Sequence, residues 1–358
     1  IYAPKNFFKK YYYKKILDFS DYEILKTNYK KNVKVNYLNK VLLTTSGTTQ
    51  NPKMVRLSNS NLYSNTKSII EYLNIKSNHT TITTMPMAYS YGLSIINSHI
   101  HAGSRIILSD KTLFDKIFWE LISKFQVTSF GGVPSFYKIL KRLKIENMNL
   151  ESIKYVTQAG GKLDIDTAKN LSKIFKFKKI QFFIMYGQTE ASPRMSYLNP
   201  NMIDRHPNSI GKPLKKSSFE IIDEKGKKIK ESFKEGEIVF FGKNVSLGYA
   251  ESIKDLYKGD INKKKLFTGD LGMRNKEGFY FLTGRKNRFI KISGFRINVE
   301  DIEKFLKIKK NLLSVSLSDN KLEILSIKKL NFTKIKEKIH KKFKIRQNDI
   351  LIKLVNNR

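Results

Sequence analysis

The segment Thr44-Thr45-Ser46-Gly47-Thr48-Thr49-Gln50-Asn51-Pro52-Lys53 follows the apolar run Val41-Leu42-Leu43. Such a run is typical of the end of a buried strand. A loop that leaves a strand with free backbone N–H groups, several hydroxyls and one lysine is suited to hold a polyphosphate. It differs from a Walker loop, whose lysine directly precedes Ser or Thr, because Met54 follows Lys53. An ordinary polar surface loop is the alternative for this stretch alone.

Downstream of this loop, short apolar segments alternate with helical segments as far as about residue 183. The expected strands are 81–86, 105–108, 127–130 and 180–184, and the expected helices are 113–125 and 134–143. Alternation of this kind predicts an α/β fold, with mixed sheets and helices in a large N-terminal domain.

The pattern changes near Ser209. Short strands broken by Gly, Asp and Lys turns are expected at 219–222, 237–241 and 278–282, which predicts a β-rich subdomain over about 209–284. After Gly284 we expect a strand at 288–292, a helix from about Val299, a hairpin pairing 312–317 with 322–327, and a helix with apolar residues at helical spacing from Phe332 to Phe343. The sequence therefore predicts a large domain over 1–284 and a small, mobile α+β domain over 285–358.

The composition limits the class of protein. With 358 residues and 40% hydrophobic content, the chain can form a large folded core. The absence of cysteine excludes disulfides and thiolate metal sites, and no apolar run approaches membrane-spanning length. These features agree with a cytoplasmic location. His99 and His101 alternate as on a strand or short turn, and the five histidines suggest no metal site.

The formal net charge of +37 raises the question of a nucleic-acid partner. Because lysines are spread through every segment, we interpret the charge as a compositional bias and expect no nucleic-acid partner; it still favours anionic ligands. Residues before about Asn39 are rich in lysine and aromatic side chains. They are either part of a larger folded region or a membrane-surface stretch, and the lack of a sustained amphipathic stripe favours the first.

Three further motifs contain residues suited to chemistry. Tyr186-Gly187-Gln188-Thr189-Glu190 follows an apolar run and presents an aromatic ring, a hydroxyl and a carboxylate together; these groups can stack on a base, bond a phosphate and hold Mg²⁺. Thr268-Gly269-Asp270 places a carboxylate at an expected turn, where it could accept bonds from ribose hydroxyls. The basic segment 284–297 is the third. Each motif alone is equally compatible with an ordinary turn, cap or strand.

Together with the Thr44–Lys53 loop and in this order, these motifs resemble the adenylate-forming superfamily, which includes acyl-CoA synthetases, adenylation domains of peptide synthetases and beetle luciferases. Intermediate stretches agree: 85–92 resembles the family's helix start beside the acyl pocket, 158–163 its adenine-contacting turn, and Gly248-Tyr249 its structural punctuation. The matches extend from about Val41 to Glu303 and so cover most of the chain.

The resemblance implies a reaction in two steps. A carboxylate attacks the α-phosphate of ATP, giving an acyl-adenylate and pyrophosphate, and a thiol of coenzyme A or of a carrier-protein phosphopantetheine arm then displaces AMP. Charge develops on oxygen in both steps, so positioned cations and hydrogen-bond donors are the main catalytic requirement. The implied partners are ATP with Mg²⁺, a small-molecule carboxylic acid and one of these thiols.

The resemblance also implies roles for individual residues. The β- and γ-phosphates would be held by Ser46, Gly47, Thr48, Thr49 and Lys53. Tyr186 would pack on the adenine, which Gly160, Gly161 and Lys162 would line, and Gly187 and Gln188 would also take part in ATP or AMP binding. Thr189 would contact the α-phosphate, Glu190 would hold Mg²⁺, and Asp270 with Arg285 would bind the ribose hydroxyls. Tyr89 and Tyr91 would lie near the acyl pocket.

In the family, the small C-terminal domain rotates between the two steps. The hinge position, usually Asp or Lys, is Asn287 here. Gly294 would line the pantetheine tunnel, and Lys291 occupies a position that assists the second step in some members.

The sequence departs from the family pattern in three places. Gln50 and Met54 stand where the family has glycine. The family's adenylation lysine follows a final strand like residues 350–355, and the sequence stops before such a segment. We therefore expect a fragment, shortened also before Thr44. Two alternatives stay open: a non-catalytic ATP- or AMP-binding relative, and a basic nucleic-acid-binding protein supported by charge alone.

Overall fold

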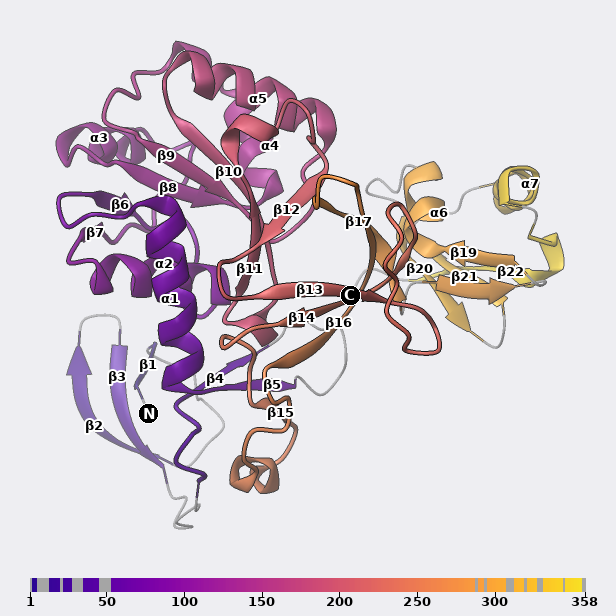
Figure 1. The fold of residues 1–358 in the computed structure, drawn as a ribbon, viewed down its shortest axis with the longest axis horizontal. Helices are drawn as coiled ribbons and strands as arrows, with labels where there is room; N and C mark the ends of the chain where they lie inside the picture. Colours follow the sequence, from indigo (N-terminus) through magenta and orange to yellow (C-terminus); the bar gives the residue numbers. More distant parts are fainter. Residues whose placement is uncertain are drawn as a thin grey trace.

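The computed structural model of the chain describes residues 2–4, 13–19, 22–27, 35–44, 53–286, 289–292, 295–306, 312–318, 321–326, 331–343 and 345–355. Within these ranges, one eleven-stranded sheet extends through the largest part of the molecule and helices pack against it (Figure 1). A smaller group of elements, from α6 to β22, lies to one side. In the described part of the chain, no helix is both long and apolar enough to cross a membrane.

The eleven strands pair in the order β13-β14-β16-β17-β12-β11-β10-β9-β8-β6-β7. Pairing is parallel from β10 to β7 and antiparallel from β10 to β13. The strands are β6 (Thr80–Ile82), β7 (Arg105–Ile107), β8 (Ser129–Gly132), β9 (Tyr155–Gln158), β10 (Gln181–Gly187), β11 (Arg194–Leu198), β12 (Ser209–Pro213), β13 (Ser218–Ile222), β14 (Gly236–Phe241), β16 (Lys265–Arg274) and β17 (Tyr280–Arg285). The predicted α/β class is confirmed, and strands β12, β13, β14, β16 and β17 continue the same sheet.

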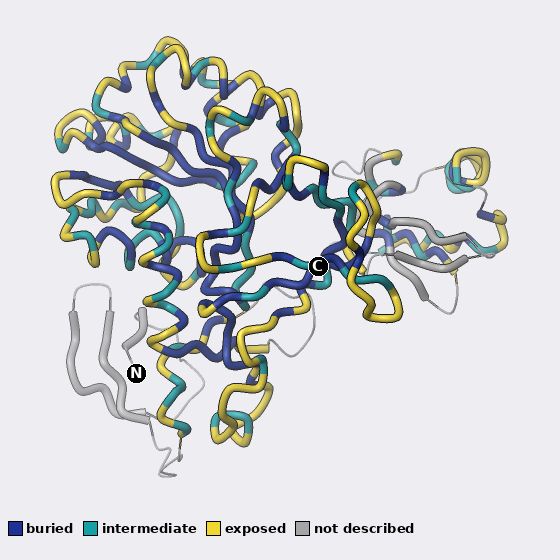
Figure 2. Tube along the Cα trace, viewed as in Figure 1, coloured by how far each residue is buried: buried dark blue, intermediate teal, exposed yellow. Residues whose placement is uncertain are grey.

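Helices cover both faces of the parallel strands. They are α1 (Asn59–Leu73), α2 (Ser90–His101), α3 (Lys116–Lys124), α4 (Pro134–Arg142) and α5 (Ile165–Phe177). Alternate residues of a strand point to opposite faces, so Phe182 of β10 packs in the cluster with α3, α4 and α5, while Phe183 packs in the cluster with α1 and α2. Figure 2 shows the resulting burial of these strands and the exposed outer sides of the helices.

Local sequence determines where helix α1 begins and ends, through capping residues at both of its ends. Ser58 accepts from the Asn61 backbone N–H at 3.1 Å, and Asn61 Oδ1 accepts from the Ser58 N–H at 2.9 Å. This reciprocal capping satisfies N–H groups that a helix start leaves unpaired. Asn74 ends the helix in the left-handed conformation, which asparagine tolerates better than most residues.

Two smaller sheets involve the N-terminal part of the chain. The strands β4 (Val41–Thr44), β5 (Met54–Leu57) and β15 (Gly248–Ala250) pair in the order β15-β5-β4, and β1 (Tyr2–Pro4), β2 (Tyr13–Phe19) and β3 (Tyr22–Thr27) form another sheet. The predicted strand before the hydroxyl-rich loop is thus present as β4. It is not a fully buried strand, because Leu43 is buried whereas Leu42 is 39% exposed.

The C-terminal elements form a core of their own. They are β18 (Phe289–Ile292), β19 (Phe295–Asn298), α6 (Val299–Phe305), β20 (Leu312–Ser318), β21 (Lys321–Ser326), α7 (Phe332–Phe343) and β22 (Ile350–Leu354). Buried Ile302, Ile324 and Ile339 belong to one hydrophobic cluster there. The pairing of β20 with β21 confirms the predicted hairpin; the expected turn residues Asp319 and Asn320 lie outside the described residues.

One local expectation is wrong. His99 and His101 lie in the last turn of helix α2, not on a strand or short turn. Serine, glycine and histidine in this segment weaken the helical signal, and packing of α2 against α1 and the sheet decides the conformation instead.

Two phenylalanines on neighbouring helices allow the core to be tested. Phe118 of α3 is fully buried, whereas Phe177 at the end of α5 is 90% exposed. Phe118→Ala leaves a cavity, so we expect the free energy of unfolding to fall by about 3–5 kcal/mol. Phe177→Ala should change it by less than about 0.5 kcal/mol. Urea denaturation followed by circular dichroism measures both, and equal losses would contradict this packing.

Candidate active site

Three strands of the large sheet bring together residues that are far apart in the sequence. The Tyr186 hydroxyl, near the end of β10, donates to Asp270 Oδ2 of β16 at 2.5 Å. Arg285 Nε, at the end of β17, donates to Asp270 Oδ1 at 2.7 Å. Gln188 Nε2 donates to Asp270 Oδ2 at 2.8 Å. Three of the residues that the sequence suggests for nucleotide binding therefore surround the carboxylate of a fourth, Asp270.

Asp270 does not lie at a turn, as its Gly-Asp motif suggests, but within strand β16 directly opposite Arg285. The turn-like signal has a local cause, since Gly269 adopts a φ of +68° inside the strand. Asp270 is only 3% exposed. A buried carboxylate is costly unless hydrogen bonds and a cation replace the lost water, and Tyr186, Gln188 and Arg285 supply these.

The charge states follow from this arrangement. Burial raises the pKa of Tyr186 well above its usual value and the Asp270 carboxylate raises it further, so Tyr186 is a neutral donor. Burial alone would lower the pKa of Arg285, but the ion pair with Asp270 outweighs this effect and raises it. Two carboxylate oxygens offer about four acceptor positions. The hydrogen bonds from Tyr186, Gln188 and Arg285 leave capacity for a hydroxyl of a ligand.

Close packing at Gly187 fixes the backbone where the chain leaves β10. A Cβ on Gly187 would lie 2.1 Å from the Pro193 backbone oxygen, so only glycine fits. The 3-10 helix η2 (Thr189–Ala191) follows. Thr189 Oγ1 lies 3.1 Å from Ser90 Oγ, at the first residue of α2. This contact places the predicted α-phosphate residue beside the start of the helix that contains Tyr91.

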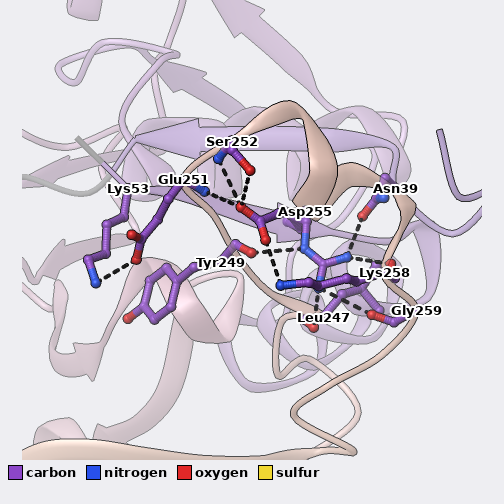
Figure 3. Close-up of polar contacts among 10 residues, drawn as sticks. Asn39, Lys53, Leu247, Tyr249, Glu251, Ser252, Asp255, Lys258 and Gly259 are labelled. Carbon is purple, nitrogen blue, oxygen red and sulfur yellow. Dashed lines mark hydrogen bonds and ion pairs between the residues drawn. The ribbon is translucent and has the colours of Figure 1, made fainter. Parts of the chain in front are cut away.

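Tyr249 of β15 connects two further predicted site residues. Its hydroxyl donates to Glu190 Oε1 at 2.6 Å, and burial, followed by the Glu190 charge, raises its pKa, so it is neutral. Lys53 Nζ lies 5.8 Å from the Tyr249 ring centroid and 2.7 Å from Glu251 Oε1 (Figure 3). The predicted metal residue and the predicted phosphate lysine thus share one aromatic neighbour.

The predicted adenine turn directly follows β9. Gly160 has a φ of +78°, and a Cβ there would lie 2.7 Å from the Tyr89 hydroxyl. Gly160, Gly161 and Lys162 are all exposed. Tyr89 therefore covers part of this turn, while the Tyr91 ring lies 6.4 Å from the Tyr89 ring and is buried.

Several predicted residues cannot be placed against this site. Ser46, Gly47, Thr48, Thr49, Asn287 and Gly294 lie outside the described residues. Lys291 lies on β18, where its backbone pairs with Arg296 of β19; its side chain lies outside the described part of the structure.

A buried arginine fixes the segment that contains Tyr249. Arg56 of β5 is 0% exposed. Its Nε donates to the Tyr249 backbone oxygen at 3.2 Å, its Nη1 to Lys258 O at 2.6 Å, and its Nη2 to Leu247 O at 2.9 Å. Further bonds reach Gly259 O and Asn39 Oδ1 (Figure 3). These acceptors are uncharged, so the guanidinium serves mainly to hold backbone that would otherwise be unpaired.

We expect Arg56→Met to lower the free energy of unfolding by about 3–5 kcal/mol, because several buried carbonyls lose their donors. Arg56→Lys should recover only part of this loss, since an ammonium cannot reproduce the planar fork. The control is Arg142→Met, at an exposed position of α4. Urea denaturation measures all three; a loss no larger than that of the control would exclude this role of Arg56.

A small cavity of about 20 Å³ lies between α1, α2 and strands β8 to β11, with room for about one water molecule. Its wall includes His99, whose Nδ1 lies 2.8 Å from the Ile95 carbonyl oxygen and whose Nε2 lies 3.1 Å from the Tyr155 hydroxyl. A carbonyl accepts, so Nδ1 holds the proton and Nε2 accepts from Tyr155. Burial lowers the pKa of His99 to about 4.

This shift makes stability depend on pH. The native pKa of His99 lies below its ordinary value of 6.5, so the unfolded chain binds the proton first and stability falls as pH decreases from 6.5 towards 4. When the pH falls from 7 to 4.5, the free energy of unfolding of wild type should decrease by about 2–3 kcal/mol more than that of His99→Gln. His101→Gln, at an exposed position of the same helix, should keep the wild-type slope. Urea titrations across this pH range measure the difference, and identical slopes for wild type and His99→Gln would contradict the shift.

Sequence patterns miss several residues of this region. Gly248-Tyr249 was notable only as structural punctuation, whereas the Tyr249 hydroxyl contacts Glu190. Ser90 lies in the stretch 85–92, but nothing in the sequence singles out its side chain, and Glu251 and Arg56 carry no sequence signal of their own. Their contacts join segments separated by many residues, and no local spacing encodes them.

Comparison with known proteins places this geometry in a family. The sequence profile described as AMP-binding enzyme matches residues 36–250. A long-chain-fatty-acid–CoA ligase of Bacillus subtilis is 29% identical over 271 residues, which are 74% of this chain and 47% of the relative. A D-alanine–D-alanyl carrier protein ligase of Listeria welshimeri is 29% identical over 296 residues, 79% of this chain and 55% of the relative. The chain thus spans about half the length of the curated relatives it matches.

The fold has counterparts among solved structures. The o-succinylbenzoate CoA synthetase of Bacillus subtilis, in complex with its acyl-adenylate intermediate, superposes with a TM-score of 0.70 at 23% identity and covers 88% of this chain and 66% of that chain. This likeness supports the fold, and the family profile covers more than half of the sequence. The protein therefore belongs to the AMP-binding enzyme family, as its resemblance to the adenylate-forming superfamily predicts.

Proposed function

We propose that the protein activates a carboxylic acid with ATP, forming an acyl-adenylate and pyrophosphate, and transfers the acyl group to a thiol. The observation that carries this proposal is the Asp270 carboxylate, held by Tyr186, Gln188 and Arg285 with acceptor capacity to spare. Family membership and the activities named for the two curated relatives support the same reaction.

The nucleotide would bind at the ends of β9, β10 and β17, beside Asp270 of β16. Asp270 would accept from the ribose hydroxyls, and Arg285 would keep the carboxylate charged and oriented. The adenine would lie against the exposed turn formed by Gly160, Gly161 and Lys162, with Tyr186, Gly187 and Gln188 completing this site. Tyr186 is already hydrogen-bonded to Asp270, so it would contribute its ring face and its position.

The phosphates would lie towards Thr189 and Lys53. Thr189 would donate to the α-phosphate, while Lys53 with Ser46, Gly47, Thr48 and Thr49 would hold the β- and γ-phosphates. Mg²⁺ commonly binds one or two carboxylates together with phosphate oxygens, and Glu190 with its partly exposed carboxylate fits that requirement. The ion would neutralise phosphate charge; Tyr249 would orient the Glu190 side chain.

In the first step, an oxygen of the acid attacks the α-phosphorus and the bond to the bridging oxygen of pyrophosphate breaks. In the second, the thiol sulfur attacks the acyl carbon and AMP leaves. The acid would occupy the region near Tyr89 and Tyr91. The acceptor would be coenzyme A or a carrier-protein phosphopantetheine, assisted by Lys291, with Gly294 lining its tunnel. The proposal includes a large domain over 1–284, a domain over 285–358 that rotates about Asn287, and a cytoplasmic location with access to ATP.

A second candidate function is ATP or AMP binding without catalysis. The observation that favours it is the presence of Gln50 and Met54 at positions where the family has glycine in the phosphate loop. Side chains at these positions restrict the backbone angles that a phosphate-binding loop can adopt.

The full-length protein should catalyse carboxylate-dependent exchange of pyrophosphate into ATP.

Asp270→Asn should weaken ATP binding about tenfold or more, because a charged hydrogen-bond acceptor is lost. Asp204→Asn, at an exposed position, is the control and should bind ATP like wild type. Calorimetric titration below the unfolding temperature of each variant measures affinity. ATP binding without exchange across a broad acid panel would select the non-catalytic alternative, and unchanged affinity of Asp270→Asn would contradict the assigned site.

A further inference from the structure

Arg194, the first residue of β11, is a buried cation that has no carboxylate partner among the described residues. The residue is 2% exposed. Its Nη2 donates to Ser94 Oγ at 3.3 Å, and its Nε donates to no acceptor in the described part of the chain. Nor does any Asp or Glu among the described residues form an ion pair with it. Buried charges are normally paired with an opposite charge, because desolvation is costly otherwise.

The surroundings of Arg194 hold the guanidinium in place without neutralising it. The guanidinium lies over the Tyr91 ring, 4.8 Å from its centroid, which is a favourable cation–π arrangement. Asn65 Nδ2 and Asn244 Nδ2 both donate to the Arg194 backbone oxygen at 2.8 Å. Burial raises the pKa of Tyr91, so no phenolate supplies the missing negative charge. The side chain is therefore fixed before any ligand binds.

Arg194 faces the cavity between α1, α2 and the sheet. The other polar side chains on the wall are Thr81, Ser94, Ser98, His99, Ser129 and Thr157. The hydroxyls of Thr81, Ser94 and Ser98 and the His99 imidazole already donate to backbone carbonyls. Arg194 Nε, which has no partner among the described residues, is therefore a donor that a bound anion could use. Apolar side chains, among them Ile69, Leu73 and Phe130, make up much of the wall, and Arg194 is its charged residue.

The cavity is close to the proposed site of adenylation. Ser90, at the start of α2, contacts Thr189, and the next residue, Tyr91, stacks on Arg194. Met185 lies on the cavity wall and directly precedes Tyr186 of the nucleotide site. The cavity holds about 20 Å³, so an acid larger than water must displace part of the wall, and the flexible Met185 is suited to such adjustment.

We propose that Arg194 binds a second anionic group of the acid substrate, so that the protein activates a short dicarboxylic acid or a similar acid with a second anionic end. The inference rests on the proposed function, since it assigns the substrate class of that same site. One carboxylate would face Thr189 and the α-phosphate, and the other would accept paired hydrogen bonds from the guanidinium, whose planar fork matches a carboxylate.

The test compares acids and variants in the full-length protein. Pyrophosphate exchange is measured with malonate, succinate and glutarate, and with acetate, butyrate and palmitate as monocarboxylic acids. We expect wild type to have the highest kcat/KM with a dicarboxylic acid. Arg194→Met should lower that value by about 100-fold, because a charged hydrogen-bonded pair is lost. The KM for ATP and the kcat/KM for butyrate should change little. The control is Arg105→Met, at an exposed position of the edge strand β7.

Two results would overturn the proposal. One is a higher kcat/KM of the wild-type enzyme with a monocarboxylic acid. The other is an equal loss of kcat/KM with butyrate and with succinate in Arg194→Met, which would mean that Arg194 only supports Tyr91. Calorimetric binding of succinate separates this inference from the proposed function. If no acid supports exchange but succinate binds to wild type and not to Arg194→Met, catalysis is excluded and the anion site stands. If succinate neither binds nor supports exchange, the anion site is excluded.

Discussion

The hydrogen-bonded carboxylate of Asp270 is the interaction on which the candidate site depends. Burial of a carboxylate that is 3% exposed is costly unless donors and a cation replace the lost water. These come from Tyr186, Gln188 and Arg285, and hence from β10, its following loop and β17. The three strands involved meet only because one sheet continues from parallel to antiparallel pairing. The site therefore forms only when the whole sheet has formed.

Two buried arginines lie near this site, and their hydrogen-bond partners show which one stabilises the fold and which one has donors left for a ligand. Arg56 donates to the backbone oxygens of Leu247, Tyr249, Lys258 and Gly259, so the folded chain itself uses its donors. Arg194 has a weak bond to Ser94, a contact with the Tyr72 hydroxyl and an unpartnered Nε within the described residues. Both are equally inaccessible to water. Only the second has donors available for a ligand, and it lies on a cavity wall.

The family fold leaves the choice of acid to side chains around a common nucleotide site, since function depends on local chemistry more than on architecture. Here the cavity beside Tyr91 is small, and its wall combines apolar side chains with hydroxyls, His99 and Arg194. The nearby Tyr91 and Asn65 hold Arg194 before binding, which reduces the ordering that a ligand would have to impose. The wall thus contains a cation that is held in place, Arg194, and a flexible residue, Met185. A purely apolar pocket has no such cation.

The sequence by itself determined the α/β class, the family, the hairpin of β20 and β21, and the order of the motifs around Tyr186, Asp270 and Arg285. These depend on local periodicity and on short motifs, which a single sequence contains. It placed Asp270 at a turn, and His99 on a strand or turn, because a glycine or a few weak helix formers dominate the local signal. Only the tertiary structure decided that Tyr249 contacts Glu190, that Arg56 holds the segment around Tyr249, and that Arg194 is buried with no counterion in the part of the chain that the structure describes. Such contacts join residues up to about two hundred positions apart, and burial and strand pairing create them.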